Sequence, residues 1–541
     1  MSQHMQSLRS PSKGSVTPSR KSSSCSGMTL NVADTRTSST ATANIGDESA
    51  LAAPALLAKA DSPREEDNRT WLQQWPGGWR PYSALTGGFC LMFISWGYVN
   101  AYGTNATFYD HTLMQGLDKM RINLIGATQC FMILGLSFIV GRLVDASHIT
   151  KVLTTGTCLV ALGTFLLAIV DGRSWSPDAV FSYVWATQGF ITGCGMACFF
   201  VPSSWVVATW FHEMKSTSIG IVATGASVGG AIFSIMTRYL IEQASFRVAS
   251  LSVAAVMTFL AALATFIAKP NTAPRRGSLE KDMDNTPEKQ ELWRAITGAW
   301  DRHALKDSRF VWVSASTACI FLGFYAIFFN IEDWAAYTGV AYREATRPST
   351  SFADAIKTFL LLTVMNASSS IGRIASAATA DHLGNYGALH VHALCTGITS
   401  ILCLVFWVLA KTVGTALGFV VVFGAFSGAV IGLPPASMAY ILDKNDPVAQ
   451  AKLGQWVGMM YTIAAPFALA GPVIAGHLIS TFGFLSLQLW SGVSLLAACG
   501  CMLMAVLSHH RHLSAKAAAE IEAQASVNVT NDMLPLSKEV Q

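Results

Sequence analysis

Residues 356–384 read IKTFLLLTVMNASSSIGRIASAATADHLG, an apolar stretch long enough to cross a bilayer as one helix, with Arg373 in its interior. A full charge at that depth costs about 3 kcal/mol on insertion scales. A membrane helix keeps such a charge mainly where it faces a cavity, a partner or a ligand. Arg373 therefore marks the part of the chain where binding is to be sought.

Polar and small residues recur along one face of this stretch. Asn366, Ser370, Arg373 and Ala377 are spaced by four, three and four residues, which places them on the same side of a helix. The opposite side is expected to be apolar, with Leu360, Leu361, Leu362 and Ile374. The pattern predicts a helix that lines a water-filled path, with Arg373 as the anchor for an anion. The alternative is that Arg373 extends to the membrane surface, since it lies about 12 Å along the axis from Asp381.

The rest of the chain has the composition of a polytopic membrane protein. Of its 541 residues 52% are hydrophobic and 13% charged, whereas soluble domains carry about 25% charged residues. Apolar runs of about 20 residues match the thickness of a bilayer. Twelve such runs are expected near 82–102, 124–144, 151–170, 180–201, 218–240, 249–268, 310–330, 356–378, 388–410, 416–437, 455–476 and 484–507. The fold class expected is an all-α membrane protein with twelve transmembrane helices.

Charge and cysteine content exclude several other classes. The net charge of +4 is too small to indicate a nucleic-acid partner. The eleven cysteines have no metal-ligand or disulfide spacing and are expected to be free thiols. No metal and no cofactor are predicted. The sequence shows no nucleophile motif and no phosphate-binding loop that would indicate a membrane enzyme.

One long polar loop divides the spans into six and six. It covers 269–309 and is rich in Lys and Arg, which predicts that it and both termini are cytoplasmic. The first 70 residues are rich in Ser and Thr and are expected to be a disordered tail, with a transit peptide as the alternative. The expected parts are the tail 1–70, the halves 71–268 and 310–508, the loop 269–309 and the tail 509–541.

A weak internal repeat supports two related halves. GRLVDASHITKVL (141–153) follows the second span, and SAATADHLGNYGAL (376–389) follows the eighth. Both place a small residue four positions before an aspartate, as Gly141 before Asp145 and Ala377 before Asp381. Parallel halves of this kind are typical of one large transporter architecture.

At this point the chain resembles the major facilitator superfamily, because residues 141–151 are similar to its Gly-x-x-x-Asp loop motif followed by basic residues. It is further similar to the fungal branch of the monocarboxylate transporter family. The similar segments are PGGWR (76–80), GYVNAYGTNATFY (97–109), GCGMACFFVPSSWVVATWF (193–211) and FSGAVIGLPPASMAYI (426–441). The superfamily resemblance implies two six-helix halves and a gating role for Gly141, Asp145 and Asp381.

The family resemblance also implies a substrate. Arg373 stands where the family binds the substrate carboxylate, and Asn366 matches an Asn of fungal members. Ser369 replaces the Asp that animal members use as a proton partner. Relatives carry monocarboxylates, the dicarboxylate itaconate, or riboflavin. The implied protein is a monomeric carrier of a small organic acid in the plasma membrane, with a vacuolar or mitochondrial membrane less favoured; proton coupling stays open.

Other polar residues allow two interpretations each. Asn100 and Tyr102 either bind a second polar group of the substrate or cap the outer end of span 1. Asn105 begins an Asn-Ala-Thr sequon expected in an outer loop, a possible glycosylation site. His477 is a candidate proton carrier, or else an interfacial or a packed, satisfied histidine.

Glu332 and Asp333 are expected at the outer mouth of the path. Transport of an organic acid is the leading hypothesis. A membrane sensor that signals through its tails is the alternative from another class.

Overall fold

The computed structural model describes residues 75–145, 147–170, 172, 174–211, 215–271, 300–341, 357–383, 387–442 and 452–536. Contacts group Met1–Asn68 apart from Arg69–Gln541, and the description concerns the second unit alone. The expected disordered tail 1–70, the transit-peptide alternative and most of the central loop lie outside the described residues.

The first half contains six spans, several of them built from consecutive helical segments. Its elements are α2 (Trp79–Asn100), α3 (Tyr102–Phe108), η2 (Tyr109–Leu113), α4 (Lys119–Gly135), α5 (Ser137–Asp145), α6 (Ile149–Leu167), α7 (Pro177–Val184), η3 (Trp185–Ile191), α8 (Thr192–Ala208), α9 (Lys215–Gln243) and α10 (Phe246–Ile267). Spans 1, 2 and 4 are the composite ones.

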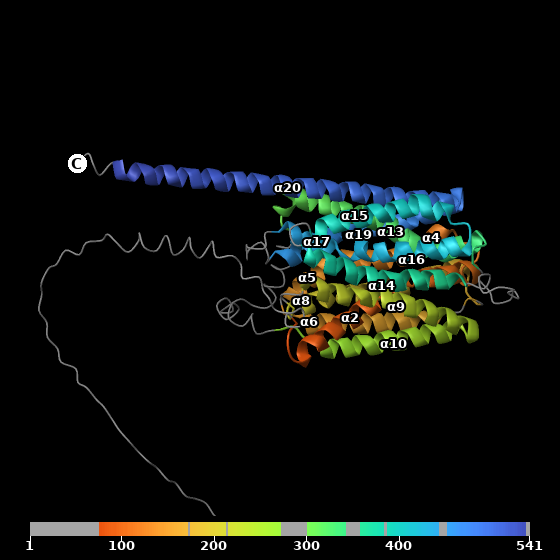
Figure 1. Cartoon of the computed structure of the whole chain (residues 1–541). Helices are drawn as coiled ribbons and strands as arrows, with labels where there is room; N and C mark the ends of the chain where they lie inside the picture. Colours follow the sequence, from red (N-terminus) through yellow and green to blue (C-terminus); the bar gives the residue numbers. More distant parts are fainter. Residues whose placement is uncertain are drawn as a thin grey trace, which may run out of the picture. The chain divides into compact units, whose positions relative to one another are not determined.

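The second half repeats this plan (Figure 1). Its elements are η4 (Ala304–Lys306), α13 (Ser308–Tyr337), α14 (Thr358–His382), α15 (Ala388–Ile401), η7 (Leu402–Trp407), α16 (Val413–Gly432), α17 (Pro434–Ile441), α19 (Leu453–Phe482) and α20 (Phe484–Leu536). Each of the twelve apolar runs expected from the sequence overlaps one of these spans. The expected tail begins at residue 509 within α20, which continues as a helix to Leu536.

Hydropathy separates two helices from the others. In the described part of the chain, ten helices are long and apolar enough to cross a membrane by length and composition. The long helices α2 and α14 are not among these ten, although each occupies the place of a span. These two are the helices that carry Asn100, Asn366 and Arg373. The spans with candidate site residues are thus the less apolar ones.

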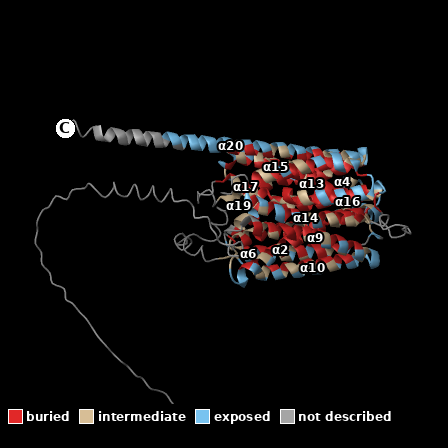
Figure 2. Ribbon diagram, viewed as in Figure 1, coloured by how far each residue is buried: buried red, intermediate tan, exposed pale blue. Residues whose placement is uncertain are grey.

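Burial follows the pattern expected for a bundle in lipid (Figure 2). Large apolar side chains such as Phe259, Phe266 and Leu409 are exposed on the outside of the bundle. On a soluble protein such surface would mark an interface, whereas in a bilayer it faces the acyl chains. Leu361 and Leu362 differ from expectation because both are fully buried. The exposed side of α14 instead carries Ile371 and Ile374.

Several helix pairs join the two halves in the described part of the chain. Helix α9 packs on α14, α4 packs on α19, and α3 packs on α13. Within the second half, a Cβ at Gly372 would overlap the backbone of Ala425. Close approach of this kind lets α14 pack directly on α16 where no hydrophobic effect drives association.

We call the end of the bundle with loops 114–118 and 338–341 the outer end, because charge bias predicts that it faces away from the cytoplasm. The opposite end is the inner end.

Candidate functional site

Arg373 lies deep within the bundle. It is 4% exposed and stands nine residues before the last residue of α14, His382. Helical side chains point toward the N-terminus of their helix, and the N-terminus of α14 is at the outer end. The guanidinium therefore points away from the inner surface, which disfavours the alternative in which it reaches the membrane interface.

The positive charge of Arg373 has no carboxylate partner among the described residues. Its Nε atom is buried and has no hydrogen-bond partner. Tyr325 on α13 and Tyr461 on α19 lie near its side chain. A buried, uncompensated cation costs several kcal/mol. A planar guanidinium in that state is suited to receive a carboxylate through two parallel hydrogen bonds.

Asn100 and Asn366 lie together on the first-half side of α14. An ideal Cβ at Gly230 of α9 would be 2.6 Å from Asn366 Oδ1 and 2.8 Å from Asn100 Cβ. Asn100 donates a hydrogen bond to the Ala226 carbonyl at 3.2 Å. The Oδ1 atoms of both asparagines are buried without a partner. The structure thus brings two sequence-predicted residues from different halves to one place.

The serines of α14 differ in their surroundings. Ser369 is buried, and its Oγ is 3.2 Å from Ser227 Oγ on α9. Ser370 is half-buried and donates to the Asn366 carbonyl at 3.5 Å. Ser369 was not among the predicted binding residues, although it faces the interface more directly than Ser370 does.

Tyr102 and Asn105 are buried within α3. The Tyr102 hydroxyl donates to the Ile122 carbonyl, and its ring packs on Phe329 with centroids 4.7 Å apart. Its polar atom is therefore used in joining spans 1 and 2. Asn105 is 4% exposed and helical, so its sequon is not in a surface loop as the sequence predicted. A glycan on Asn105 is incompatible with this conformation.

The predicted gating residues lie at the inner end. Asp381 accepts hydrogen bonds from Thr217 N at 3.0 Å and Thr217 Oγ1 at 2.8 Å, in the first turn of α9. A carboxylate at a helix N-terminus is favoured by the helix dipole, and this one joins the two halves. Gly141 lies in α5 near Val201 of α8. Asp145 ends α5, and its side chain lies outside the described atoms.

His477 lies apart from these groups. It is on an exposed face of α19. The structure does not bring it to Arg373, so the proton-carrier hypothesis gains no support from its position.

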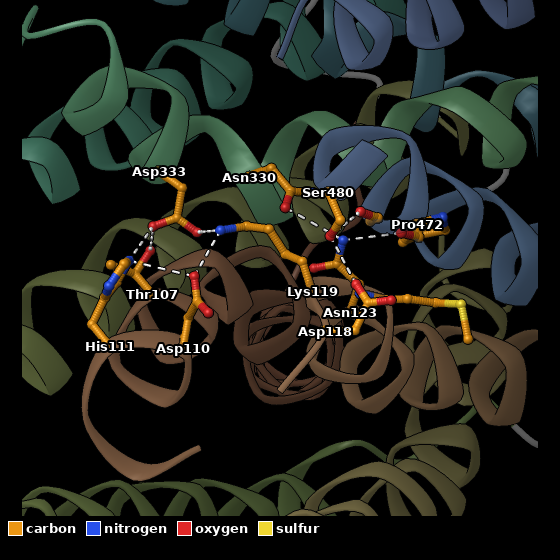
Figure 3. A network of polar contacts seen from close by, with 12 residues as sticks. Thr107, Asp110, His111, Asp118, Lys119, Asn123, Asn330, Asp333, Pro472 and Ser480 are labelled. Atoms are coloured by element: carbon orange, nitrogen blue, oxygen red, sulfur yellow. Dashed lines mark hydrogen bonds and ion pairs between the residues drawn. The ribbon is translucent and has the colours of Figure 1, made fainter. Parts of the chain in front are cut away.

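A second polar cluster, which we call the outer network, consists of Thr107, Asp110, His111, Lys119 and Asp333 (Figure 3). Lys119 Nζ is 2.7 Å from Asp333 Oδ2 and 2.8 Å from Asp110 Oδ2. Thr107 donates to Asp333 Oδ1 at 3.1 Å, and His111 Nε2 is 3.5 Å from the same oxygen. Asp333 belongs to the second half and the other four residues to the first. The network therefore ties the halves together at the outer end.

The sequence predicted only part of this cluster. Glu332 and Asp333 were expected at an open mouth, but they are 0% and 4% exposed. Ligand atoms of Asp110, His111 and Asp333 lie within 4.8 Å of one another, a spacing that a metal ion would also suit. The Lys119 ammonium already occupies the position between the two carboxylates, so the protein itself supplies a cation to both of them.

Further contacts beside the network hold α4 against the second half. Asn123 Nδ2 donates to the Pro472 carbonyl at 2.9 Å and to Asn330 Oδ1 at 3.3 Å (Figure 3). Asp118, the N-cap of α4, accepts from Ser480 at 2.7 Å. The described conformation is thus closed at its outer end.

Comparison with known protein families now adds to this geometry. Residues 83–469 match the model of the Major Facilitator Superfamily. The chain belongs to this superfamily. The expected all-α fold with twelve transmembrane helices is thereby confirmed, and membrane transport of a small molecule is its function.

Three similar proteins are fungal transporters. An agnestins efflux protein of Paecilomyces divaricatus is 27% identical over 81% of this chain and 90% of its own length. An MFS-type transporter of Emericella nidulans is 28% identical over 75% of this chain and 80% of its own length. An aspyridones efflux protein of the same fungus is 26% identical over 77% of this chain and 75% of its own. These names specify neither a monocarboxylate nor itaconate, so the resemblance to the monocarboxylate transporter family is not confirmed.

Proposed function

We propose that this chain exports a small organic acid by alternating access and that Arg373 binds the carboxylate. The observation that carries the proposal is the buried Arg373 guanidinium, which has no carboxylate partner among the described residues. The naming of two relatives as efflux proteins supports the outward direction. Export would place the chain in the plasma membrane, and one chain supplies both halves of the path.

The contacts between halves suggest how access alternates. Opening to the outside requires the outer network to separate, because Asp333 lies on the half opposite Lys119. Opening to the inside requires Asp381 to leave Thr217. Arg373 lies between these two closures, on the helix that carries Asp381 at its inner end. A carboxylate bound there would neutralise the buried charge of Arg373.

The proposal is tested by flux through proteoliposomes. Labelled monocarboxylates and dicarboxylates, itaconate included, are offered together with riboflavin to the wild type, Arg373→Lys and Arg373→Gln. We expect Arg373→Lys to lower saturable carboxylate flux by roughly 10- to 100-fold, because a lysine lacks the planar pair of donors. Arg373→Gln should abolish flux. Arg121→Lys is the matched control, since Arg121 forms an exposed ion pair with Asp178.

Each outcome assigns the function differently. Carboxylate flux that Arg373→Lys leaves intact would keep a transporter but remove Arg373 as its anchor. Flux of riboflavin alone would make the substrate a neutral or weakly charged solute. A folded protein that moves none of these compounds would favour the sensor, and deletion of residues 1–70 would then be the next variant.

A further inference from the structure

Five aromatic side chains form a continuous cluster across the two halves beside Arg373. The aromatic cluster consists of Trp96 on α2, Phe200 on α8, Phe321 and Tyr325 on α13, and Tyr461 on α19. Trp96 stacks on Tyr325 with centroids 5.5 Å apart and planes at 24°. Phe200 meets Trp96 at 5.5 Å and Tyr461 at 5.0 Å, both edge-on. Every contact between Trp96 or Phe200 and the other three crosses the interface that alternating access must open.

The cluster shares two members with the surroundings of Arg373. Tyr325 and Tyr461 lie near its guanidinium. Tyr325 thus contacts Trp96 through its ring and lies near Arg373. A ligand held by Arg373 therefore meets aromatic faces from both halves as soon as it extends past the anchor.

Trp96 also offers a polar group that the protein does not use. It is 4% exposed, and its Nε1 is buried without a hydrogen-bond partner. A buried indole N–H usually finds an acceptor, and it can only donate. The unused donor on one half and the unused Arg373 Nε on the other match a ligand with an oxygen at each end.

Ordinary packing is the competing explanation, and Trp407 supplies the comparison. Trp407 is also fully buried, its Nε1 also lacks a partner, and it stacks on Phe419 at 5.4 Å and 10°. Its ring partners Trp334 and Phe419 both belong to the second half. Trp407 is therefore a tryptophan of the same kind placed within one half, away from the interface that opens.

We infer that the transported acid is an aryl carboxylate with a further oxygen on or beside its ring, and that Trp96 determines this specificity. The inference rests on the proposed role of Arg373. The carboxylate would pair with Arg373, the planar ring would pack among the aromatic rings that part when the halves separate, and the second oxygen would accept from Trp96 Nε1 at the edge of the indole.

The test uses two acids that differ only in aromaticity. 4-Hydroxybenzoate and 4-hydroxycyclohexanecarboxylate carry the same oxygens and the same number of carbons. Binding and flux of each are measured for the full chain in proteoliposomes, for the wild type, Trp96→Leu, Trp96→Phe and Trp407→Phe. We expect the wild type to prefer the aryl acid by roughly three- to tenfold. Trp96→Leu should bring the ratio close to one, while Trp407→Phe leaves it unchanged.

Trp96→Phe separates stacking from hydrogen bonding. It should keep the preference for the aryl ring but lose the advantage of 4-hydroxybenzoate over benzoate, because the phenyl ring has no donor. A purely structural role of Trp96 would lower transport of both acids together and leave both ratios unchanged, which would overturn the inference. Loss of the ratio in Trp407→Phe to the same extent would overturn it as well.

Failure of this inference is distinguishable from failure of the proposed function. Equal, Arg373-dependent transport of both acids would remove the aromatic preference alone. Transport of neither acid, nor of any aliphatic carboxylate, would remove the proposed function and this inference with it.

Discussion

The outer network and the surroundings of Arg373 differ in how their buried charges are paired. In the outer network, two carboxylates share the Lys119 ammonium at 2.7 and 2.8 Å. Arg373 is about as buried as Asp333 but has no described carboxylate partner. Both lie at the interface between the halves. In one region the protein supplies the counter-ion itself, whereas the other contains a cation that, in our proposal, a ligand neutralises.

This difference separates a structural role from a binding role. A paired buried charge is strongly destabilising when one partner is removed, because the other stays buried without compensation. An unpaired buried charge already carries that cost in the native state, so its removal relieves the cost. Residues that lower stability in this way are concentrated at functional sites. Stability measurements should therefore rank Lys119 and Arg373 oppositely.

The largest effect is expected for Lys119→Met. The substitution keeps most of the side-chain volume and leaves Asp333, whose side chain is 3% exposed, without its cation. We expect a loss of about 3 kcal/mol in stability and a fall of several degrees in the melting temperature of the detergent-solubilised protein. The measurement is thermal unfolding followed by size-exclusion of the soluble fraction.

Arg121→Met provides the matched control for Lys119→Met. Arg121 pairs with Asp178 near the same end, but their side chains are 47% and 72% exposed. An exposed pair contributes under about 1 kcal/mol, so the control should melt close to the wild type. Equal losses of stability in the two variants would show that water screens the outer network and that the network does not hold the halves together.

A smaller, directional effect is expected from the two closures. Asp333→Asn weakens the outer network, whereas Asp381→Asn weakens the acceptor that holds Thr217 at the inner end. Each change should favour opening at its own end by about 1 kcal/mol, because a charge-assisted bond is replaced by a neutral one. Hydrogen–deuterium exchange should rise in η2 and the start of α4 for Asp333→Asn. For Asp381→Asn it should rise instead in the first turns of α9.

Each of these two variants is the control for the other. Increased exchange at both ends in either variant would indicate general loosening of the bundle, and the opposition between the two closures would then be lost.

The fold was largely predictable from the sequence because lipid permits few alternatives. A chain in hydrocarbon must satisfy its backbone internally, so an apolar run of the right length becomes a helix. The borders were less predictable. Span 4 was expected at 180–201 but runs from Pro177 to Ala208 through the π-helical η3. Helix α20 continues well past the predicted limit of the membrane, since nothing in hydropathy marks the end of a helix that leaves the bilayer.

The candidate site was predictable only where its signal is local. Arg373 is conspicuous because it is a charge within an apolar run, and the three- and four-residue spacing placed Asn366 beside it. The outer network depends instead on pairing at long range. Thr107 and Asp333 are separated by 226 positions along the chain. From the sequence alone, Lys119 is expected to be a charged loop residue before span 2, although it begins α4. No periodicity within one helix indicates which charges meet across the halves.

The smallest change in stability, and the sharpest contrast with Lys119, is expected for Arg373→Met. This substitution keeps an unbranched side chain of moderate length and removes a cation that has no described counter-ion. We expect the melting temperature to stay constant or rise, by the equivalent of about 1 kcal/mol at most, while carboxylate flux is lost. If Arg373→Met instead destabilises the protein as much as Lys119→Met does, then Arg373 is paired within the folded chain. Both regions would then contain charges paired within the protein. The binding site would have to be sought at Asn100 and Asn366, the asparagines beside Gly230. If the variant is stable, inactive and still closed at its outer end by hydrogen exchange, the cation is kept for its ligand.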